Sequence, residues 1–408
     1  MSWSRGEFFK ALSLLPLAGL GLPGLRRDSG PPRVQVTGDP YSRYEPWVEI
    51  YPEHVRHNVR EIHRAVGGRP ITAVIKNNGY GMGVVNAAWA LEGLDPVEAV
   101  AVVKLSEALA LRDAGITKPV ILLSPVHGEE LEEVARREIV PMVYTPQGQE
   151  LERIAARTDR PMAVEVKVDT GLGRLGVRRE EATEVYGDLN DRPGVRIRGS
   201  FITLTESEDF DREVIDRYSA LLDRLEQDGF DVGDRHAVST TPIFRHPEAY
   251  FDRVRPGMGL YGVYPQPETQ RAQDLMDLRP ALALKCRVLQ VKRLEAGETA
   301  GYGQAFEAEG PTWLATLPVG HADGWQRDAA GCAEVRINGR HHPVVASVSA
   351  SHTLVDLGDD TDVRAGDEAV VFDHEEGSRP DDIHRACGVS TYDLLMHLSP
   401  ALPRHVME

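Results

Sequence analysis

The segment Ala73-Val74-Ile75-Lys76 ends an apolar, β-rich run with a lysine, and the chain then turns through Asn77-Asn78-Gly79-Tyr80-Gly81. In proteins that alternate strands and helices, reactive groups gather at the carboxyl ends of the strands. A lysine there is partly desolvated, which favours its neutral amine and makes it a nucleophile toward an aldehyde. A solvated lysine at the start of a loop is the competing interpretation, and Lys76 alone does not decide between the two.

The elements around Lys76 predict its setting. From Trp47 to Tyr261, apolar runs that predict strands alternate with charged stretches of helical spacing. This alternation is typical of an α/β (β/α)8 barrel. A doubly wound open sheet is the alternative, but its G-x-G-x-x-G fingerprint is missing after the first strand. The predicted strands are 48–50, 71–76, 99–103, 119–123, 140–144, 164–168, 195–201, 236–239 and 254–261.

The chain changes character after Arg279, where short strand-like runs are separated by Gly, Asp and Asn turns. We therefore expect a C-terminal β-rich domain at 279–408 after a barrel at 45–278. An export-signal-like leader and linker is expected at 1–33.

The leader begins with positive residues, continues through the apolar stretch 11–25 and ends with Arg26-Arg27, which is the pattern of an export signal. Residues 4–10 resemble a twin-arginine motif, except that Gly6 stands at the place of the second arginine. The pattern predicts export to the periplasm or cell envelope. A cytoplasmic protein with an ordinary N-terminal extension is the alternative.

Composition limits the partners. The 46 Lys and Arg against 63 Asp and Glu give a formal charge of −17, which repels phosphate backbones and argues against nucleic acid. No apolar run reaches the roughly 20 residues of an integral membrane span. Three cysteines are too few for a disulfide scaffold, and Cys332 is expected to be a thiol. Adjacent His341-His342 on a strand would point to opposite faces, so no metal site is predicted.

The motif A-V-I-K-N-N-G-Y-G-M-G at 73–83 resembles the pyridoxal-phosphate attachment motif of the bacterial alanine racemase family. The resemblance extends from Trp47 to about Tyr392 and spans both predicted domains. It implies pyridoxal 5'-phosphate as cofactor, a barrel followed by a β domain, and a homodimer with shared active sites. Further motifs of the resemblance are S-E-A at 106–108, K-V-D-T-G-L-G-R at 167–174, V-R-P-G-M-G-L-Y-G at 254–262, G-Y-G at 301–303 and H-A-D-G-W-Q-R at 321–327.

The resemblance also implies catalytic roles. Lys76 would bind the cofactor covalently and then serve as one proton-transfer base, and Tyr302 of the partner subunit would be the other. Inversion at a carbon needs two bases on opposite faces. Arg255 would face the pyridine nitrogen and, because arginine does not readily give up a proton, leave that nitrogen unprotonated. Arg174 would pair with the substrate carboxylate or contact Tyr302.

For the phosphate, the resemblance implies Tyr80, Ser239, the Gly257 backbone and Tyr392. A glycine at position 257 makes physical sense because a residue without a Cβ lets the phosphate approach the backbone. Tyr392 could equally be a core tyrosine. Lys167 matches a lysine that is carbamylated in many family members.

Several positions depart from the family pattern. Thr203 stands where a ring-stacking histidine is usual, and Val238 where an asparagine is usual. Ala350 and Ser351 replace a methionine and an aspartate that line the substrate's carboxylate, which predicts a roomier and less negative pocket around Ala350. The remaining departures are Asn78 for an aspartate and His321 for a tyrosine.

These observations predict an isomerase that racemises a small amino acid, L-alanine to D-alanine, by Lys76 and Tyr302. One alternative is a broader-specificity amino-acid racemase that acts on larger or basic substrates. Another is a catalytically degenerate homologue that only binds pyridoxal phosphate. A basic amino-acid decarboxylase on the same barrel is disfavoured, because its glycine-triplet phosphate loop and its Cys-Asp pair are absent from the sequence.

Overall fold

The computed structural model describes residues 44–266 and 269–407. The expected leader at 1–33 lies outside the described residues. Among the helices of the described part, none is long and apolar enough to cross a membrane, and no group of three His, Cys, Asp or Glu side chains is placed to hold a metal ion.

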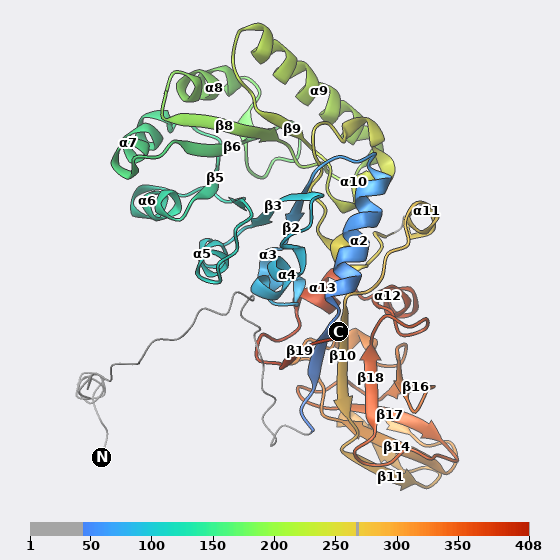
Figure 1. The fold of residues 1–408 in the computed structure, drawn as a ribbon. Helices are drawn as coiled ribbons and strands as arrows, with labels where there is room; N and C mark the ends of the chain where they lie inside the picture. The colour runs from blue at the N-terminus through green and yellow to red at the C-terminus, as the bar shows by residue number, and fades with distance from the viewer. Residues whose placement is uncertain (1–43, 267–268, 408) are drawn as a thin grey trace, which may run out of the picture. The chain divides into compact units, whose positions relative to one another are not determined.

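The first large element is a parallel barrel (Figure 1). Each strand pairs with the next one in the chain, apart from the two-residue strand β7 (Val177–Arg178), which pairs with β6 alone. The ring closes where Ile71 forms a bridge with Val254 and the Thr72 amide donates to the Val254 carbonyl at 2.9 Å. In their order around the sheet, the strands are β2 (Ile71–Val74), β3 (Val97–Val102), β4 (Val120–Leu122), β5 (Ile139–Val143), β6 (Met162–Asp169), β8 (Val195–Phe201) and β9 (Asp234–His236).

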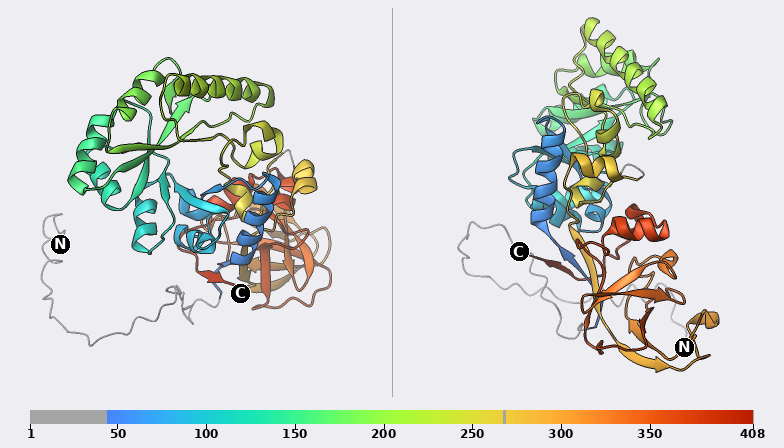
Figure 2. Two further views of the ribbon diagram at one scale, coloured as in Figure 1. Left: turned by 45° about the horizontal axis from the view of Figure 1, so that its top comes forward. Right: turned by 90° about the vertical axis from the view of Figure 1, so that its right-hand side faces the viewer.

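Helices range around these strands (Figure 2, left). Their apolar residues recur every three or four positions, as in α6, where Leu131, Val134 and Ala135 are buried against the sheet. The helices are α2 (Pro52–Ala65), α3 (Lys76–Tyr80), α4 (Val84–Leu91), α5 (Leu105–Asp113), α6 (Gly128–Arg136), α7 (Gly148–Thr158), α8 (Ala182–Asn190), α9 (Glu208–Gln227), α10 (Thr240–Arg245), α11 (Thr269–Leu275) and the 3-10 turn η1 (Pro247–Ala249).

The barrel closes less regularly than the sequence predicts. The expected strand at 254–261 is reduced to the bridge at Val254, and the chain then forms the 3-10 turn η2 (Met258–Tyr261). Gly262 ends this turn with a φ of 79°, and a Cβ there would clash with the Arg279 carbonyl. The glycines of this segment therefore bend the backbone where regular pairing would keep it straight.

The second element is a nine-stranded sheet in the order β11-β14-β17-β16-β15-β18-β10-β1-β19. Its strand β1 (Trp47–Ile50) comes from the start of the described chain, antiparallel to β10 and parallel to β19 (Figure 1). The segment expected to form only the barrel thus contributes a strand to the C-terminal sheet. The other strands are β10 (Leu282–Arg287), β11 (Gln290–Leu294), β14 (Thr312–Leu317), β15 (Glu334–Ile337), β16 (Arg340–Val345), β17 (Thr353–Gly358), β18 (Glu368–Phe372) and β19 (Arg404–Val406), with β12 (Thr299–Ala300) and β13 (Phe306–Glu307) as a separate pair.

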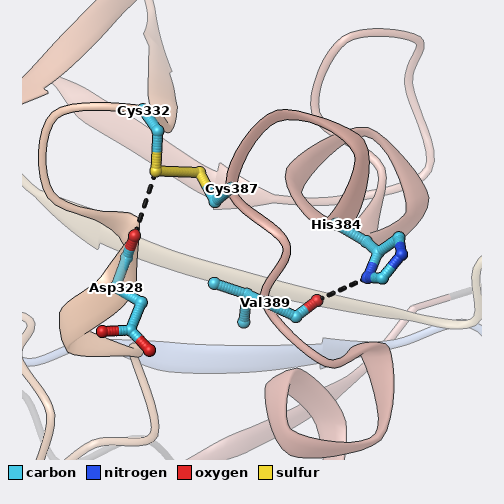
Figure 3. Close-up of a disulfide and its surroundings, with 5 residues drawn as sticks. All are labelled: Asp328, Cys332, His384, Cys387 and Val389. Carbon is cyan, nitrogen blue, oxygen red and sulfur yellow. Dashed lines mark hydrogen bonds between the residues drawn. A yellow bond between two sulfur atoms is a disulfide. The ribbon is translucent and has the colours of Figure 1, made fainter.

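Two short helices lie between β18 and β19 in the chain, α12 (Pro380–Cys387) and α13 (Thr391–Met396). Cys387 at the end of α12 forms a disulfide with Cys332, which follows the turn η4 (Arg327–Ala329) (Figure 3). The expectation of a free thiol at Cys332 is therefore wrong. Because 55 residues separate the two cysteines, their spacing gave no sign that α12 folds back onto this turn. The remaining cysteine, Cys286, is buried and free.

Candidate active site

Lys76 lies where β2 ends and α3 begins, at the carboxyl end of the barrel strands. The residues after it, 77–81, all have positive φ values, between 52° and 92°. Burial lowers the pKa of Lys76, and the Arg174 guanidinium lowers it further, whereas the Glu107 carboxylate opposes them. The net effect favours the neutral amine, which is the form that attacks an aldehyde.

A place for a phosphate adjoins this lysine. Tyr80 is buried, and a Cβ at position 257 would clash with its hydroxyl, so Gly257 leaves open space beside that hydroxyl. The ring of Tyr392, on α13, lies 6.4 Å from the ring of Tyr80, and Ser239 is the residue before α10. Tyr392 is 43% exposed and hence not a core tyrosine. Three hydroxyls and an unobstructed backbone fit a phosphate group.

Arg255 is buried and held by hydrogen bonds at both ends of its guanidinium group. One nitrogen lies 2.6 Å from Nδ1 of His236, and the other donates to the Ile202 carbonyl at 2.6 Å. Burial lowers the pKa of Arg255 to about 10, which still leaves it cationic at neutral pH. Because arginine only donates, Nδ1 of His236 must accept from Arg255. Arg253 lies 3.0 Å from Nε2, but the Glu165 carboxylate at 2.9 Å needs a donor there, which assigns the proton of a neutral imidazole to Nε2. Burial likewise lowers the pKa of His236.

A buried network of charged residues contacts His236, the hydrogen-bond partner of Arg255. His236 Nε2 donates to Glu165 at 2.9 Å, and Glu165 also accepts from Arg198 and Arg253 at 2.7 Å each. Burial alone would raise the pKa of Glu165, but His236, Arg253 and Arg198 together lower it, so the carboxylate stays ionised. The chain of bonds fixes the orientation of the Arg255 guanidinium through His236.

Lys167 is also buried near Arg255, and its amine donates to the Thr203 hydroxyl at 2.8 Å. The same amine lies 4.5 Å from the centre of the Phe201 ring, and the Arg255 guanidinium lies 4.9 Å from it. Burial, followed by the charges of Arg255 and Arg174, lowers the pKa of Lys167 to about 7. Thr203, which departs from the family pattern, thus accepts a bond from a lysine whose pKa is lowered far below its ordinary value.

The predicted site residues of the β domain lie together in a second group, apart from those around Lys76. Tyr302 starts the 3-10 turn η3 (Tyr302–Gln304) and is 81% exposed. Ala350 is exposed in the loop between β16 and β17, and its carbonyl accepts from the Ala322 amide at 3.0 Å, beside His321. A Cβ on Gly301 would lie 2.6 Å from the Cβ of Ala346 in the same loop. Within the described residues, no hydrogen bond or ring contact joins this group to Lys76.

Some residues of the site were not predicted. Thr240 accepts the amides of Gly257 and Gly259 at 3.0 and 3.2 Å and so shapes the phosphate place. Glu165 and Arg253 form the ion network behind Arg255. The sequence carried a signal for Glu165, because it is a charged residue inside the apolar run of β6. Thr240 carried none beyond its position next to Ser239.

Comparison with known proteins agrees with this geometry. Residues 50–265 match the family described as alanine racemase, N-terminal domain, and residues 281–406 match alanine racemase, C-terminal domain. The chain is 33% identical over 365 residues to an alanine racemase of Carboxydothermus hydrogenoformans, covering 88% of this chain and 98% of the relative. It is 32% identical to alanine racemase 2 of Caldanaerobacter subterraneus subsp. tengcongensis, covering 88% and 93% of the two chains.

Solved structures give the same result. The crystal structure of an alanine racemase from the D-cycloserine-producing Streptomyces lavendulae matches with a TM-score of 0.83 at 29% identity, covering 89% of this chain and 97% of that one. An alanine racemase from Streptomyces coelicolor matches with a TM-score of 0.82 at 26% identity, covering 89% and 98%.

Proposed function

The chain belongs to the alanine racemase family, and we propose that it interconverts L- and D-alanine with two bases, Lys76 and Tyr302. It is an amino-acid racemase, an isomerase, and its cofactor is pyridoxal 5'-phosphate. When bound, the cofactor withdraws electrons from the α-carbon and makes its proton acidic. The observation that carries the proposal is the position of Lys76 at the barrel mouth, beside the place for a phosphate and near the same Arg174 that acts on Lys167.

In the proposed mechanism, each base works on one face of the substrate. The Lys76 amine takes the α-proton from one enantiomer while the Tyr302 hydroxyl delivers a proton to the opposite face, and the reverse reaction exchanges these roles. Arg174 holds the substrate carboxylate. Arg255, which remains cationic, would face the pyridine nitrogen and, because arginine does not readily give up a proton, would leave that nitrogen unprotonated.

The phosphate is held by neutral donors in this proposal. The hydroxyls of Tyr80, Ser239 and Tyr392 would donate to it, and Gly257 would allow the close approach. The burial that raises the pKa of Tyr80 supports this role, because the phenol keeps the proton it must donate.

The active site is proposed to form between two copies of the chain, with Lys76 from one and Tyr302 of the partner subunit. What supports this is that Tyr302 is largely exposed and lies in a group that no hydrogen bond or ring contact joins to Lys76 in the described part of the chain. A mixture of inactive Lys76→Ala and Tyr302→Phe chains tests it. Random dimers would restore about a quarter of the wild-type activity, because half are hybrids and each hybrid has one complete site. No recovery after subunit exchange, with hybrids present, would contradict the shared site.

A broader-specificity racemase is the second candidate, because Ala350 and Ser351 are exposed where the family has larger and charged side chains. Incubation of a panel of L-amino acids in deuterium oxide separates the candidates. Turnover of alanine with α-deuteration supports the first, and turnover of lysine or arginine but not alanine supports the second. Deuteration without D-product would mean that one base does not act, and no turnover at all would indicate a degenerate homologue.

Export to the periplasm or cell envelope is also proposed. The leader pattern supports it, and so does the disulfide between Cys332 and Cys387, because disulfides persist in oxidising compartments. Cell fractionation followed by thiol counting is the test. A full-length chain found only in the cytosol, with three free thiols, would contradict export.

A further inference from the structure

We propose that Glu107 is a positioning residue for Lys76, which holds the left-handed turn after this lysine and stabilises the lysine amine when it carries a proton. The inference rests on the proposed function of Lys76 as a base. Glu107 is not among the residues to which the sequence or the family resemblance gave a role.

The first contact is with the backbone of the turn. Glu107 lies in the first turn of α5 and is 8% exposed. One of its carboxylate oxygens accepts the backbone amide of Asn78 at 2.7 Å. The bond crosses from one element of the barrel to another, because 29 residues separate its two ends.

The turn needs such support, because its conformation is unfavourable. Asn77, Asn78 and Tyr80 have φ values of 53°, 58° and 52°, although each carries a Cβ. A left-handed residue other than glycine costs about 1–2 kcal/mol, and less for asparagine, whose short polar side chain tolerates this region. Tyr80 therefore carries most of the strain, and the stretch persists only where the surroundings fix it. The bond to Glu107 satisfies an amide in the middle of this strained stretch, directly after Lys76.

The second carboxylate oxygen of Glu107, unlike the first, accepts no hydrogen bond among the described residues, although it is buried. A buried carboxylate oxygen without a partner is costly unless a cation lies near. The charge of Glu107 acts on the Lys76 amine, where it opposes the effects of burial and of Arg174.

The other groups at the turn do not replace this carboxylate. Tyr80 and Tyr261 are buried and Tyr392 is partly so, and this desolvation raises the pKa of each, so all three are neutral phenols. Arg404 donates to the Gly81 carbonyl at 2.9 Å and is itself a cation. Among the charged groups that act on the Lys76 amine in the described residues, Arg174 repels its proton and Glu107 attracts it.

This arrangement has a use in racemisation. When Lys76 takes the α-proton, its nitrogen becomes an ammonium group that must be stabilised inside a partly desolvated site. Glu107 supplies the compensating negative charge without touching the substrate. Glu107 therefore keeps the Lys76 amine basic enough to accept the α-proton. Burial and Arg174 keep the amine unprotonated before this step, so that it can act as a base.

The test compares Glu107→Gln and Glu107→Ala with Asp113→Asn, which removes a carboxylate from the same helix α5 but from an exposed pair with Arg137. The cofactor is removed from each full-length protein, and acetic anhydride then labels its lysines over a range of pH. Mass spectrometry of the peptide that contains Lys76 gives the apparent pKa of its amine. Covalent attachment of added pyridoxal phosphate is measured separately by borohydride reduction.

We expect Glu107→Gln to lower the apparent pKa of Lys76 by about one unit, which is about a tenfold gain in neutral amine at neutral pH. Its amide can still accept from Asn78, so attachment of the cofactor at high pH should stay near the wild-type rate. Glu107→Ala loses the same charge and also the bond to the turn, so at high pH, where the Lys76 amine is neutral in every variant, it should slow attachment by about tenfold. Asp113→Asn should match the wild type in both measurements.

An unchanged Lys76 pKa in Glu107→Gln would overturn the electrostatic part, and a wild-type rate of attachment at high pH in Glu107→Ala would overturn the support of the turn. The Gln variant keeps the test decisive if the Ala variant does not fold. Labelling requires no turnover, so its result is independent of the proposed function. That function would fail instead if Lys76→Arg still racemised alanine.

Discussion

The residues at the mouth of the barrel and those around Tyr302 in the β domain differ in how many contacts hold their side chains within a single chain. Arg255 and Lys167 are buried and joined to their neighbours by hydrogen bonds of 2.6–2.8 Å. Tyr302 and Ala350 are exposed on turns of the other domain. A single chain therefore completes the part that would hold the cofactor, whereas the part that would meet the substrate's other face is open to a partner.

The departures from the family pattern have different consequences in these two regions. In the barrel, the Thr203 hydroxyl accepts a hydrogen bond from Lys167, so replacing Thr203 would change the environment of this buried amine. In the β domain, Ala350 and Ser351 are exposed, so their replacement would change the shape and charge of a surface. Cofactor chemistry and substrate choice are thus expected to respond to different mutations.

The largest expected effect comes from removing each base in turn. Lys76→Arg should abolish both racemisation, by at least about 10⁴-fold, and the borohydride-stable attachment of the cofactor, because a guanidinium does not act as the nucleophile. Tyr302→Phe should lose about 10²–10⁴-fold in kcat but keep full attachment. Loss of attachment in Tyr302→Phe would show that the two regions are not separate.

Next in size is the disulfide of the β domain. Replacing both Cys332 and Cys387 by serine should lower the free energy of unfolding by about 2–4 kcal/mol, because the crosslink closes a long loop. The measurement is denaturant unfolding, and wild-type protein reduced before unfolding is the matched control. Equal stability of the oxidised and reduced wild type would show that the crosslink contributes nothing.

A smaller effect is expected in the barrel from Lys167→Met, measured in buffer free of carbon dioxide. The folded pKa of about 7 lies below the ordinary lysine value, so the unfolded state binds more protons between these values. The cost of burying Lys167 is therefore full below pH 7 and shrinks as pH rises. Lys167→Met should be more stable by about 1–4 kcal/mol at pH 7, and its advantage should fall by about 1.4 kcal/mol per pH unit up to pH 9. A constant difference would contradict this assignment.

The smallest expected effect concerns substrate choice. Ala350→Met should refill the pocket and raise the preference for alanine over a larger amino acid by about tenfold, because one or two methylenes are worth about that much. The ratio of kcat/KM values measures it, and Ala346→Ser in the same loop is the control. A lower kcat/KM for all substrates by the same factor would mean that Ala350 does not select among them.

The sequence predicted the elements better than their connections. The alternation of apolar runs predicted the barrel strands because the period of a buried parallel strand depends on local residues. The assignment of β1 to the C-terminal sheet and the pairing of Cys332 with Cys387 depend on contacts between distant segments, and nothing near these residues indicates them.

The site shows the same division. The resemblance named Lys76, Arg255 and Gly257 by motif, and the structure places them at the mouth of one barrel. It could not indicate that Glu165 and His236 orient Arg255, because this network is assembled from β6, β9 and the segment that closes the barrel. The hydrogen bond between Lys167 and Thr203 likewise joins the ends of two strands.

The position of β1 also has a consequence for how the chain matures. A polypeptide made from its N-terminus presents Trp47–Ile50 early, but the neighbours of this strand, β10 and β19, follow only at Leu282–Arg287 and Arg404–Val406. The strand must remain unpaired during most of synthesis, so the sheet reaches completion only near the end of translation. A fragment that stops after the barrel would keep an orphan strand with exposed edges, which is an aggregation hazard.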